Sequence, residues 1–289
     1  MTDFATPGGE ARHEGTAGST RRSLVAVRPV DRTTPLSTAV WATHERQTSA
    51  SSGSVTTLIR CSLQPFGMEI ALLGGTGDIG EGLALRWAAD SAHDVLVGSR
   101  DPERAAAKAT EYATALDERG RDASVEGLGN VEAAQRADVI VTAVPAYHLT
   151  DTVESIADEL SPDDVLVSPA VGMKRDEDGF HYNRPGVGSV TQLAANAAPD
   201  DVPVVGAFHN LAAGRLADLD ADLDWDTVVV GDESDAKDTV IELAESIEGL
   251  RALDGGPLAN AAEIEGLTPL LINVARHNDG LHDLGVRFQ

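Results

Sequence analysis

Short apolar runs alternate with amphipathic stretches along the chain from residue 68 onward. The run EIALLGG at 69–75 is brief and aliphatic, as in a strand that is buried on both faces of a parallel sheet. The next stretch, DIGEGLALRWAADSA at 78–92, carries its apolar residues at helical spacing. The pattern therefore predicts a strand, a glycine-rich turn and a helix in direct succession.

The same alternation continues over the following hundred residues. We expect strands at 94–100, Ser124–Glu126, Asp138–Ala143 and Val165–Ser168, with helices from Pro102 to about Glu118 and from Leu149 to about Glu159. Strands that alternate with helices are typical of a doubly wound parallel sheet. The predicted fold class is α/β with a Rossmann-like sheet.

The pattern is looser after about residue 190. We expect strands at Val202–Ala207 and Thr227–Val230, a helix at Ser234–Ile247 and a helical segment at 259–278 with a buried face. This predicts a Rossmann-like domain at residues 68–190 and a smaller α/β domain at residues 191–289. The apolar surplus of 259–278 suits either a subunit interface or the core of the smaller domain.

Residues 1–67 have a different composition. Ser and Thr supply 19 of these 67 residues, and Pro and Gly interrupt the apolar positions, which favours disorder. Met68 stands one residue before the first predicted strand. The alternative to a disordered extension is therefore that translation starts at Met68.

The charge balance excludes one class of partner. The chain has 22 Lys and Arg against 47 Asp and Glu, a net charge of −25. Nucleic-acid binding needs a basic surface, so we expect no nucleic-acid partner. So acidic a chain with only three lysines indicates a halophilic protein in a high-salt cytosol, where the Debye length of about 3 Å screens the repulsion.

Membrane insertion and disulfide chemistry are not expected either. The sequence has no apolar run of 18 or more residues, so it predicts no transmembrane helix. Its single cysteine, Cys61, allows neither an internal disulfide nor a cysteine metal site in the body of the protein. A reducing, cytoplasmic location fits this composition.

The turn after the first strand predicts a dinucleotide site. Gly75, Gly77 and Gly80 fit the spacing G-x-G-x-x-G. The first glycine allows a tight turn, the second lets a pyrophosphate approach the backbone, and the third lets the helix pack closely on the strand. The first helical residues, Asp78 and Ile79, then offer free backbone N–H groups to the pyrophosphate.

The end of the second strand distinguishes between the two nicotinamide cofactors. A chain that binds NAD has Asp or Glu there, on the ribose 2′-hydroxyl, whereas this chain has Ser99 and Arg100, with Arg104 one turn into the next helix. A hydroxyl and two guanidinium groups suit a 2′-phosphate, which predicts NADP(H). The alternative is that both arginines only pair with surface acids.

Two later strands end in VIVTAVPAYH and VLVSPAVG. Their last residues should lie at the carboxyl edge of the sheet, where ligands of this fold bind. The residues expected there are Val144, Pro145, Tyr147, His148, Ser168 and Pro169.

Together these motifs resemble the NADPH-dependent reductases of the deazaflavin coenzyme F420, also called F420-dependent NADP oxidoreductases. The resemblance covers residues 68–289 but not 1–67. It is carried by ALLGGTGDIGEGLALR, VGSRDPERA, VTAVPAYH, VVGAFHN, LDWDTVVVGD, GLRALDGGPLAN, LTPLLINVARHN and LGVRF.

The resemblance implies a homodimeric enzyme that transfers a hydride reversibly between C4 of the nicotinamide of NADP(H) and C5 of F420. Such a protein has mainly to align two rings and exclude water. It requires no nucleophile and no metal, and the sequence has no H-E-x-x-H motif or cysteine cluster.

The resemblance also assigns residues. Thr76 joins the glycine turn at the dinucleotide, and Val144, Pro145 and His148 border the nicotinamide. His209 lines the deazaflavin pocket, which the smaller domain completes together with the dimer interface. The family usually continues after this histidine with a proline and two alanines before an arginine, whereas this chain reads FHNLAAGRLA at 208–217. Contacts of the two residues after His209 are therefore not transferred.

Both histidines have a structural alternative, His209 as a core or capping residue and His148 as a residue that only precedes a helix. The phosphate and glutamates of the F420 tail require cations. The candidates are Lys174, Arg175, Arg184, Arg215 and Arg276, and each could instead belong to a structural ion pair.

Two other functions share this fold pattern, because fold does not determine function. An NADP-dependent imine or hydroxyacid reductase would need a proton donor, typically Lys, His or Glu, beside its substrate, and no lysine of the body is expected at a strand's carboxyl end. A non-catalytic NADP(H) sensor would bind NADPH without changing the absorbance of added F420.

Overall fold

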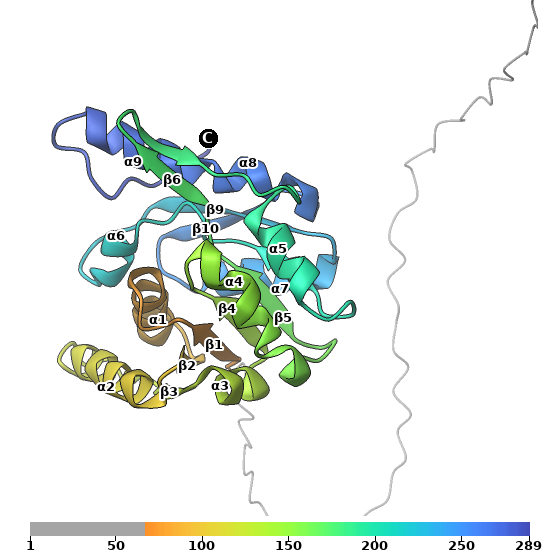
Figure 1. Cartoon of the computed structure of the whole chain (residues 1–289). Helices are drawn as coiled ribbons and strands as arrows, with labels where there is room; N and C mark the ends of the chain where they lie inside the picture. Colours follow the sequence, from red (N-terminus) through yellow and green to blue (C-terminus); the bar gives the residue numbers. More distant parts are fainter. Residues whose placement is uncertain (1–66) are drawn as a thin grey trace, which may run out of the picture. The chain divides into compact units, whose positions relative to one another are not determined.

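The computed structural model of the chain describes residues 67–289 (Figure 1). The predictions for residues 1–67 thus fall almost wholly outside the described part. Within it, no helix is long and apolar enough to cross a membrane.

One sheet of eight strands forms the centre of the described protein, in the order β10-β9-β8-β5-β4-β1-β2-β3. Neighbouring strands are parallel, except that β9 runs antiparallel to β8. The strands are β1 (Glu69–Leu73), β2 (Asp94–Ser99), β3 (Val125–Gly129), β4 (Val139–Thr142), β5 (Val165–Ser168), β8 (Val204–Gly206), β9 (Trp225–Gly231) and β10 (Leu250–Asp254).

Helices cover both faces of this sheet (Figure 1). They are α1 (Asp78–Asp90), α2 (Pro102–Asp117), α3 (Asn130–Arg136), α4 (Ala146–Glu154), α5 (Val190–Ala197), α6 (Ala213–Ala217), α7 (Ser234–Glu245), α8 (Ala261–Glu265) and α9 (Leu267–His277). The hairpin of β6 (Met173–Asp176) and β7 (Gly179–Tyr182) forms a separate small sheet. The predicted α/β fold class is confirmed, with two reversed strands at one end of the sheet.

The alternation of side chains along β1 creates two cores. Ile70 and Leu72 belong to the core under α1, α2 and α7, whereas Ala71 and Leu73 belong to the core under α3, α4 and α5. Successive residues of a strand point to opposite faces, so a continuously apolar strand is buried on both sides. The apolar run at 69–75 is thus explained by its place in the middle of the sheet.

Some elements differ from the sequence-based expectation. Gly266 divides the helical segment predicted at 259–278 into α8 and α9. Helix α4 begins at Ala146 and not at Leu149, so His148 lies in its first turn. The elements α3, α5, α6, β6, β7 and β10 were not predicted; the helices among them have eight residues or fewer, too short for a clear period.

The domain boundary expected between residues 190 and 191 falls within α5, directly after its first residue, Val190. Strands from both sides of this position, β5 and β8, pair in parallel within the same sheet. The division into residues 68–190 and 191–289 stays a prediction.

Arg86 joins α1 to the segment after α6. This buried side chain donates to the carbonyl oxygens of Leu216 (3.0 Å), Asp218 (2.6 Å) and Ala221 (2.8 Å). Burial lowers the pKa of Arg86. The contact holds α6 and the segment after it against α1, and the first residues of α6, Ala213 and Gly214, line a cavity described below.

Candidate dinucleotide and deazaflavin site

A cavity of about 180 Å³ opens between the glycine turn and the ends of β2 and β4. Eight of the predicted site residues line it: Thr76, Gly77, Ser99, Arg100, Arg104, Val144, Pro145 and His148. Gly74 and Ala143, which lie in the quoted motifs but had been given no role, line it as well, and so do Asn130 and Thr152, which lie outside every motif. The predicted residues Gly75, Asp78, Ile79, Gly80, Ser168, Pro169 and His209 are not part of its lining.

The glycine turn is sterically demanding at two of its motif positions. A Cβ on Gly75 would come within 2.8 Å of the Leu72 carbonyl oxygen, and one on Gly80 within 2.6 Å of the Gly75 Cα. A Cβ on Gly77, in contrast, would meet only the Gly74 carbonyl oxygen, at 3.4 Å. The protein itself leaves room at Gly77, so its missing side chain fits the close approach of a pyrophosphate.

A tyrosine of α2 holds the turn from behind. The hydroxyl of the buried Tyr112 donates to the Gly75 carbonyl oxygen at 2.9 Å. Burial raises the pKa of Tyr112, so its hydroxyl keeps the proton that it donates. This bond connects the turn with the helix that carries Arg104.

Three polar residues at and after the end of β2, Ser99, Arg100 and Arg104, are available to bind an anion. The Ser99 hydroxyl accepts a hydrogen bond from the Asp101 backbone N–H at 3.2 Å, which leaves its own proton free to donate. Arg100 and Arg104 are exposed, and neither forms an ion pair with any residue in 67–289. Within the described residues, the two arginines therefore do not pair with surface acids, contrary to the alternative interpretation.

On the other side of the cavity, the loop after β4 presents Val144 and Pro145, and α4 presents His148 from its first turn. The rings of Tyr147 and His148 lie 4.4 Å apart, and 79% of Tyr147 is exposed. The arrangement offers an apolar wall and one imidazole to a ring that would lie at this edge of the sheet.

His209 lies inside the protein, on the loop after β8. It is 3% exposed and lines neither this cavity nor the larger one described below. Its Nε2 lies 3.3 Å from the Thr191 hydroxyl oxygen, and that hydroxyl donates to Glu265 Oε1 at 2.9 Å. Because the hydroxyl proton points to the carboxylate, the histidine must donate from Nε2, and Nδ1 keeps a free lone pair.

Glu265 is the centre of this buried network. Besides the Thr191 hydroxyl, its carboxylate accepts from the backbone N–H groups of Val190 and Thr191, both at 2.9 Å, and from the Tyr182 hydroxyl at 2.6 Å. Burial raises the pKa of Tyr182, which keeps it a donor. One side chain of α8 thus holds the start of α5, the β6–β7 hairpin and, through Thr191, the His209 loop.

The same loop carries further signs of a constrained conformation. Phe208 has a φ of 65°, although it is not a glycine, and such strain persists only where the surroundings impose it. Its N–H donates to the Thr227 hydroxyl at 3.1 Å, and Asn210 donates to the Asp226 carbonyl oxygen at 2.7 Å. Strand β9 thereby fixes the conformation of the loop.

The buried state of His209 predicts a pH effect on stability. Burial lowers its pKa to about 3, below the unfolded value of about 6.5. As pH falls, the unfolded chain therefore binds a proton at this histidine before the folded chain does. The contribution of neutral His209 to the free energy of unfolding is complete above pH 6.5, and below it decreases by about 1.4 kcal/mol per pH unit. Between pH 6.5 and 5, the free energy of unfolding measured in urea should fall less steeply with pH in His209→Gln than in the unchanged chain.

His93 also has a pKa lowered by burial, so the free energy of unfolding of the variant should still decrease somewhat as pH falls. An equally steep decrease in His209→Gln and in the unchanged chain would mean that His209 is accessible to protons in the folded protein.

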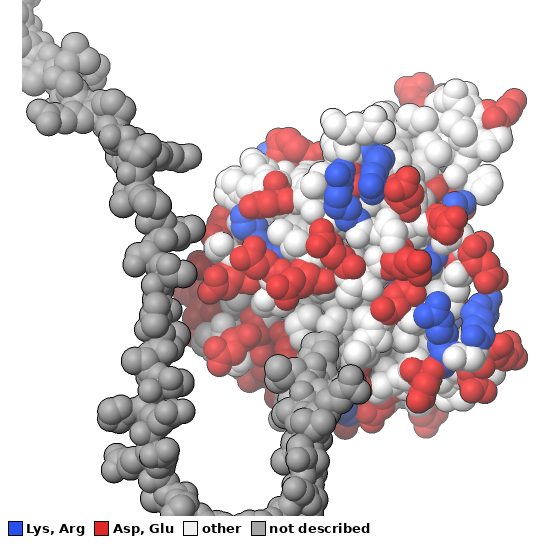
Figure 2. Space-filling view, turned by 180° about the vertical axis from the view of Figure 1, so that it is seen from behind, with Lys and Arg blue, Asp and Glu red and all other residues white. Residues whose placement is uncertain are grey.

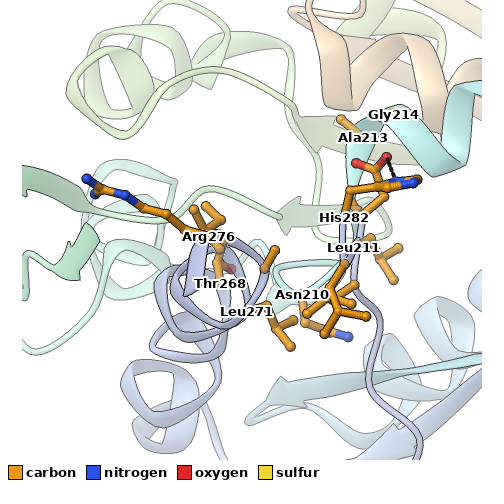
Figure 3. Close-up of a pocket in the computed structure, with 14 residues that line it drawn as sticks. Asn210, Leu211, Ala213, Gly214, Thr268, Leu271, Arg276 and His282 are labelled. Atoms are coloured by element: carbon orange, nitrogen blue, oxygen red, sulfur yellow. Dashed lines mark hydrogen bonds and ion pairs between the residues drawn. The ribbon is translucent and has the colours of Figure 1, made fainter. Parts of the chain in front are cut away.

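A second cavity, of about 550 Å³, lies beside the His209 loop (Figure 3). Its walls are the loop from Asn210 to Gly214, one side of α9 and the C-terminal segment at 281–284. Asp226 holds that C-terminal segment, since it binds Arg251 at 2.8 and 2.6 Å and accepts from the Phe288 N–H at 2.6 Å. Leu211, Leu271 and Ile272 give the cavity a largely apolar lining.

Of the cations suggested for the F420 tail, Arg276 lines the second cavity. Arg215 and Arg184 donate to the carbonyl oxygens of Asp222 and Gly188, and Arg175 lies over the Phe180 ring. Lys174 lines neither this cavity nor the cavity at the glycine turn. Acidic side chains are prominent on the face shown in Figure 2, with a few Lys and Arg between them.

Within residues 67–289, no group of three or more His, Cys, Asp or Glu side chains is placed to hold a metal ion.

Several known proteins are similar to this chain. A family described as "NADP oxidoreductase coenzyme F420-dependent" matches residues 69–172. An F420-dependent NADP reductase of Methanocaldococcus jannaschii is 38% identical over 212 residues, 72% of this chain and 92% of the relative. One of Methanothermobacter thermautotrophicus is 40% identical over 224 residues, 76% of this chain and 94% of the relative.

A solved protein of Arthrobacter sp. FB24, provisionally described as an F420-dependent NADP-reductase, has the same fold. It superposes with a TM-score of 0.64 at 24% identity, covering 77% of this chain and all of that one.

Proposed function

Because the chain belongs to the family of F420-dependent NADP reductases, we propose that it transfers a hydride between NADP(H) and coenzyme F420. The observation that carries this proposal is the cavity at the glycine turn, the dinucleotide cavity. There an open turn and two arginines that form no ion pair within residues 67–289 face an apolar wall. Bound NADPH supplies a hydride from C4 of its nicotinamide, and the oxidised deazaflavin accepts it at C5.

The residues of the cavity have separate tasks in this proposal. Gly77 admits the pyrophosphate to the start of α1, where free N–H groups favour an anion. Ser99, Arg100 and Arg104 hold the 2′-phosphate by charge-assisted hydrogen bonds. Val144, Pro145 and His148 position the nicotinamide ring.

We assign the deazaflavin to the second cavity. Its apolar walls suit a flat aromatic ring, and Leu211 lies on a loop that β9 and α5 hold rigidly. Arg276 lines the cavity, but its guanidinium points away from the other lining side chains (Figure 3), so it offers a cation to an anionic tail that extends beyond the cavity. Ser168 is the last residue of β5 and Pro169 begins the loop after it, and the Ala207 N–H donates to the Ser168 carbonyl oxygen at 3.3 Å.

His209 is assigned a positioning role, and not the direct contact with the deazaflavin that the resemblance implies. The evidence is its burial behind Asn210 and Leu211, both of which line the second cavity. A neutral imidazole with a low pKa also cannot donate a catalytic proton near neutral pH.

We also propose that the enzyme is a cytoplasmic homodimer. Helix α9 exposes Leu270 (55%) and Val274 (38%), and the C-terminal segment exposes Leu281 (47%) and Phe288 (44%). Exposed apolar side chains on α9 and on the segment that follows it suit an interface with a second copy. Sedimentation equilibrium in high salt measures the mass of the assembly directly, and cell fractionation measures the location.

A labelling experiment tests the proposed reaction. With NADPH deuterated at the transferred C4 position, the deuterium should appear at C5 of reduced F420 and should not exchange with solvent, because the aligned rings transfer the hydride directly. Absorbance of the oxidised deazaflavin follows turnover, and mass spectrometry follows the label. His148→Ala should be slower because the ring is less well aligned, yet it should retain full label transfer.

Solvent hydrogen at C5 would contradict direct transfer. NADPH binding without any loss of deazaflavin absorbance would instead identify a sensor.

A further inference from the structure

Asn130 is a polar residue of the dinucleotide cavity that no motif identified. It is the first residue of α3 and lines the cavity together with Ser99, Arg100 and Arg104. Its side-chain Oδ1 is buried and has no hydrogen-bond partner among residues 67–289. Buried amide oxygens are rarely left without a donor, so the oxygen calls for a partner that this part of the chain does not provide.

The backbone beside Asn130 explains why the amide lies where it does. A Cβ on Gly98 would come within 3.0 Å of Asn130 Oδ1 and 2.9 Å of a Leu73 methyl group. The glycine therefore makes the space that the amide fills.

The sheet register places Asn130 at the adenosine end of the site. Gly129 pairs with Ser99 at the ends of β3 and β2, and the residues that follow them, Asn130 at the start of α3 and Arg100 directly after β2, line the same cavity. Arg100 is proposed to hold the phosphate on the adenosine ribose. A neutral acceptor next to it can take a proton donor of the nucleoside without repelling that phosphate, which a carboxylate would do.

We propose that the Asn130 amide accepts a hydrogen bond from the adenosine moiety of NADP(H) and, as a neutral acceptor, contributes to the preference for the 2′-phosphate. The inference rests on the proposed function, because it assumes the same cofactor in the same cavity. Two donors of this moiety share the required chemistry, the ribose 3′-hydroxyl and the adenine amino group.

The test uses adenosine 2′,5′-bisphosphate, which carries the proposed contact but no nicotinamide. Calorimetric titration of the full chain should show that Asn130→Ala weakens binding about 2- to 10-fold, the loss of one hydrogen bond. Asn130→Asp should weaken it more, since the carboxylate repels the 2′-phosphate, and should affect NADH less than NADPH. Gln135→Ala, the matched control on the exposed side of α3, should leave binding unchanged.

The inosine analogue of the bisphosphate distinguishes the two donors. If the adenine amino group is the donor, the unchanged protein should bind the analogue more weakly, and Asn130→Ala should add no further loss. If the ribose hydroxyl is the donor, the loss caused by Asn130→Ala should be equal for both ligands.

Thermal unfolding without ligand checks that each variant folds, and the isosteric Asn130→Asp keeps the test valid if the alanine variant does not. Unchanged affinity for adenosine 2′,5′-bisphosphate in both variants would overturn the role of Asn130 while leaving the proposed function intact. Failure of the unchanged protein to bind NADPH would overturn the proposed function itself.

Discussion

Replacement of Glu265 by alanine is expected to lower the free energy of unfolding by about 3–5 kcal/mol, since it leaves several buried donors without a partner. Glu265 is fully buried, and its carboxylate accepts four hydrogen bonds, two from backbone N–H groups at the start of α5 and two from the hydroxyls of Tyr182 and Thr191. Denaturant unfolding monitored by circular dichroism measures the loss.

Two further variants separate the network from general effects of mutation. Glu265→Gln keeps one acceptor oxygen and the side-chain shape, so its loss should be smaller than that of the alanine variant. Glu263→Ala changes an exposed carboxylate of the same helix and should alter stability by no more than about 0.5 kcal/mol. A loss in Glu265→Ala as small as that of Glu263→Ala would show that water satisfies the donors.

Replacement of Arg100 by alanine should weaken NADPH binding by about 10- to 100-fold and leave NADH binding nearly unchanged. Only NADPH loses a charge-assisted hydrogen bond to its 2′-phosphate, a contribution of about 1.5–3 kcal/mol. Kinetic titration with both cofactors in the presence of oxidised F420 measures the two KM values, and direct titration measures the two Kd values.

Arg119→Ala provides the matched control for this charge change. Arg119 is an exposed arginine that lies outside the cavity and pairs with Asp220 at 3.4 Å, so its loss changes the net charge by the same amount without touching the site. An equal effect of Arg100→Ala on both cofactors would contradict the assignment of Arg100 to the 2′-phosphate.

Local patterns were sufficient to predict most elements of the first half of the fold, α3 excepted, and eight of the residues that line the cavity at the glycine turn. A buried parallel strand must be apolar throughout, and a turn that admits a pyrophosphate needs glycine, so β1 and the residues Gly75, Gly77 and Gly80 are visible in the sequence itself. Ser99 and Arg100 were predicted from their position at the end of the second strand. In each case one short segment carries both the structure and its chemical signal.

The reversal of β9, the break at Gly266 and the roles of Asn130 and Glu265 depend on contacts between distant segments. Glu265 reaches Thr191 across 74 positions of the chain, and no periodicity within α8 distinguishes a carboxylate that accepts four buried bonds from one that faces solvent. His209 presents the same difficulty, because a histidine after a strand has the same sequence signal whether it lines a pocket or fills a core. Burial decides between these states, and burial is a property of the packed elements together.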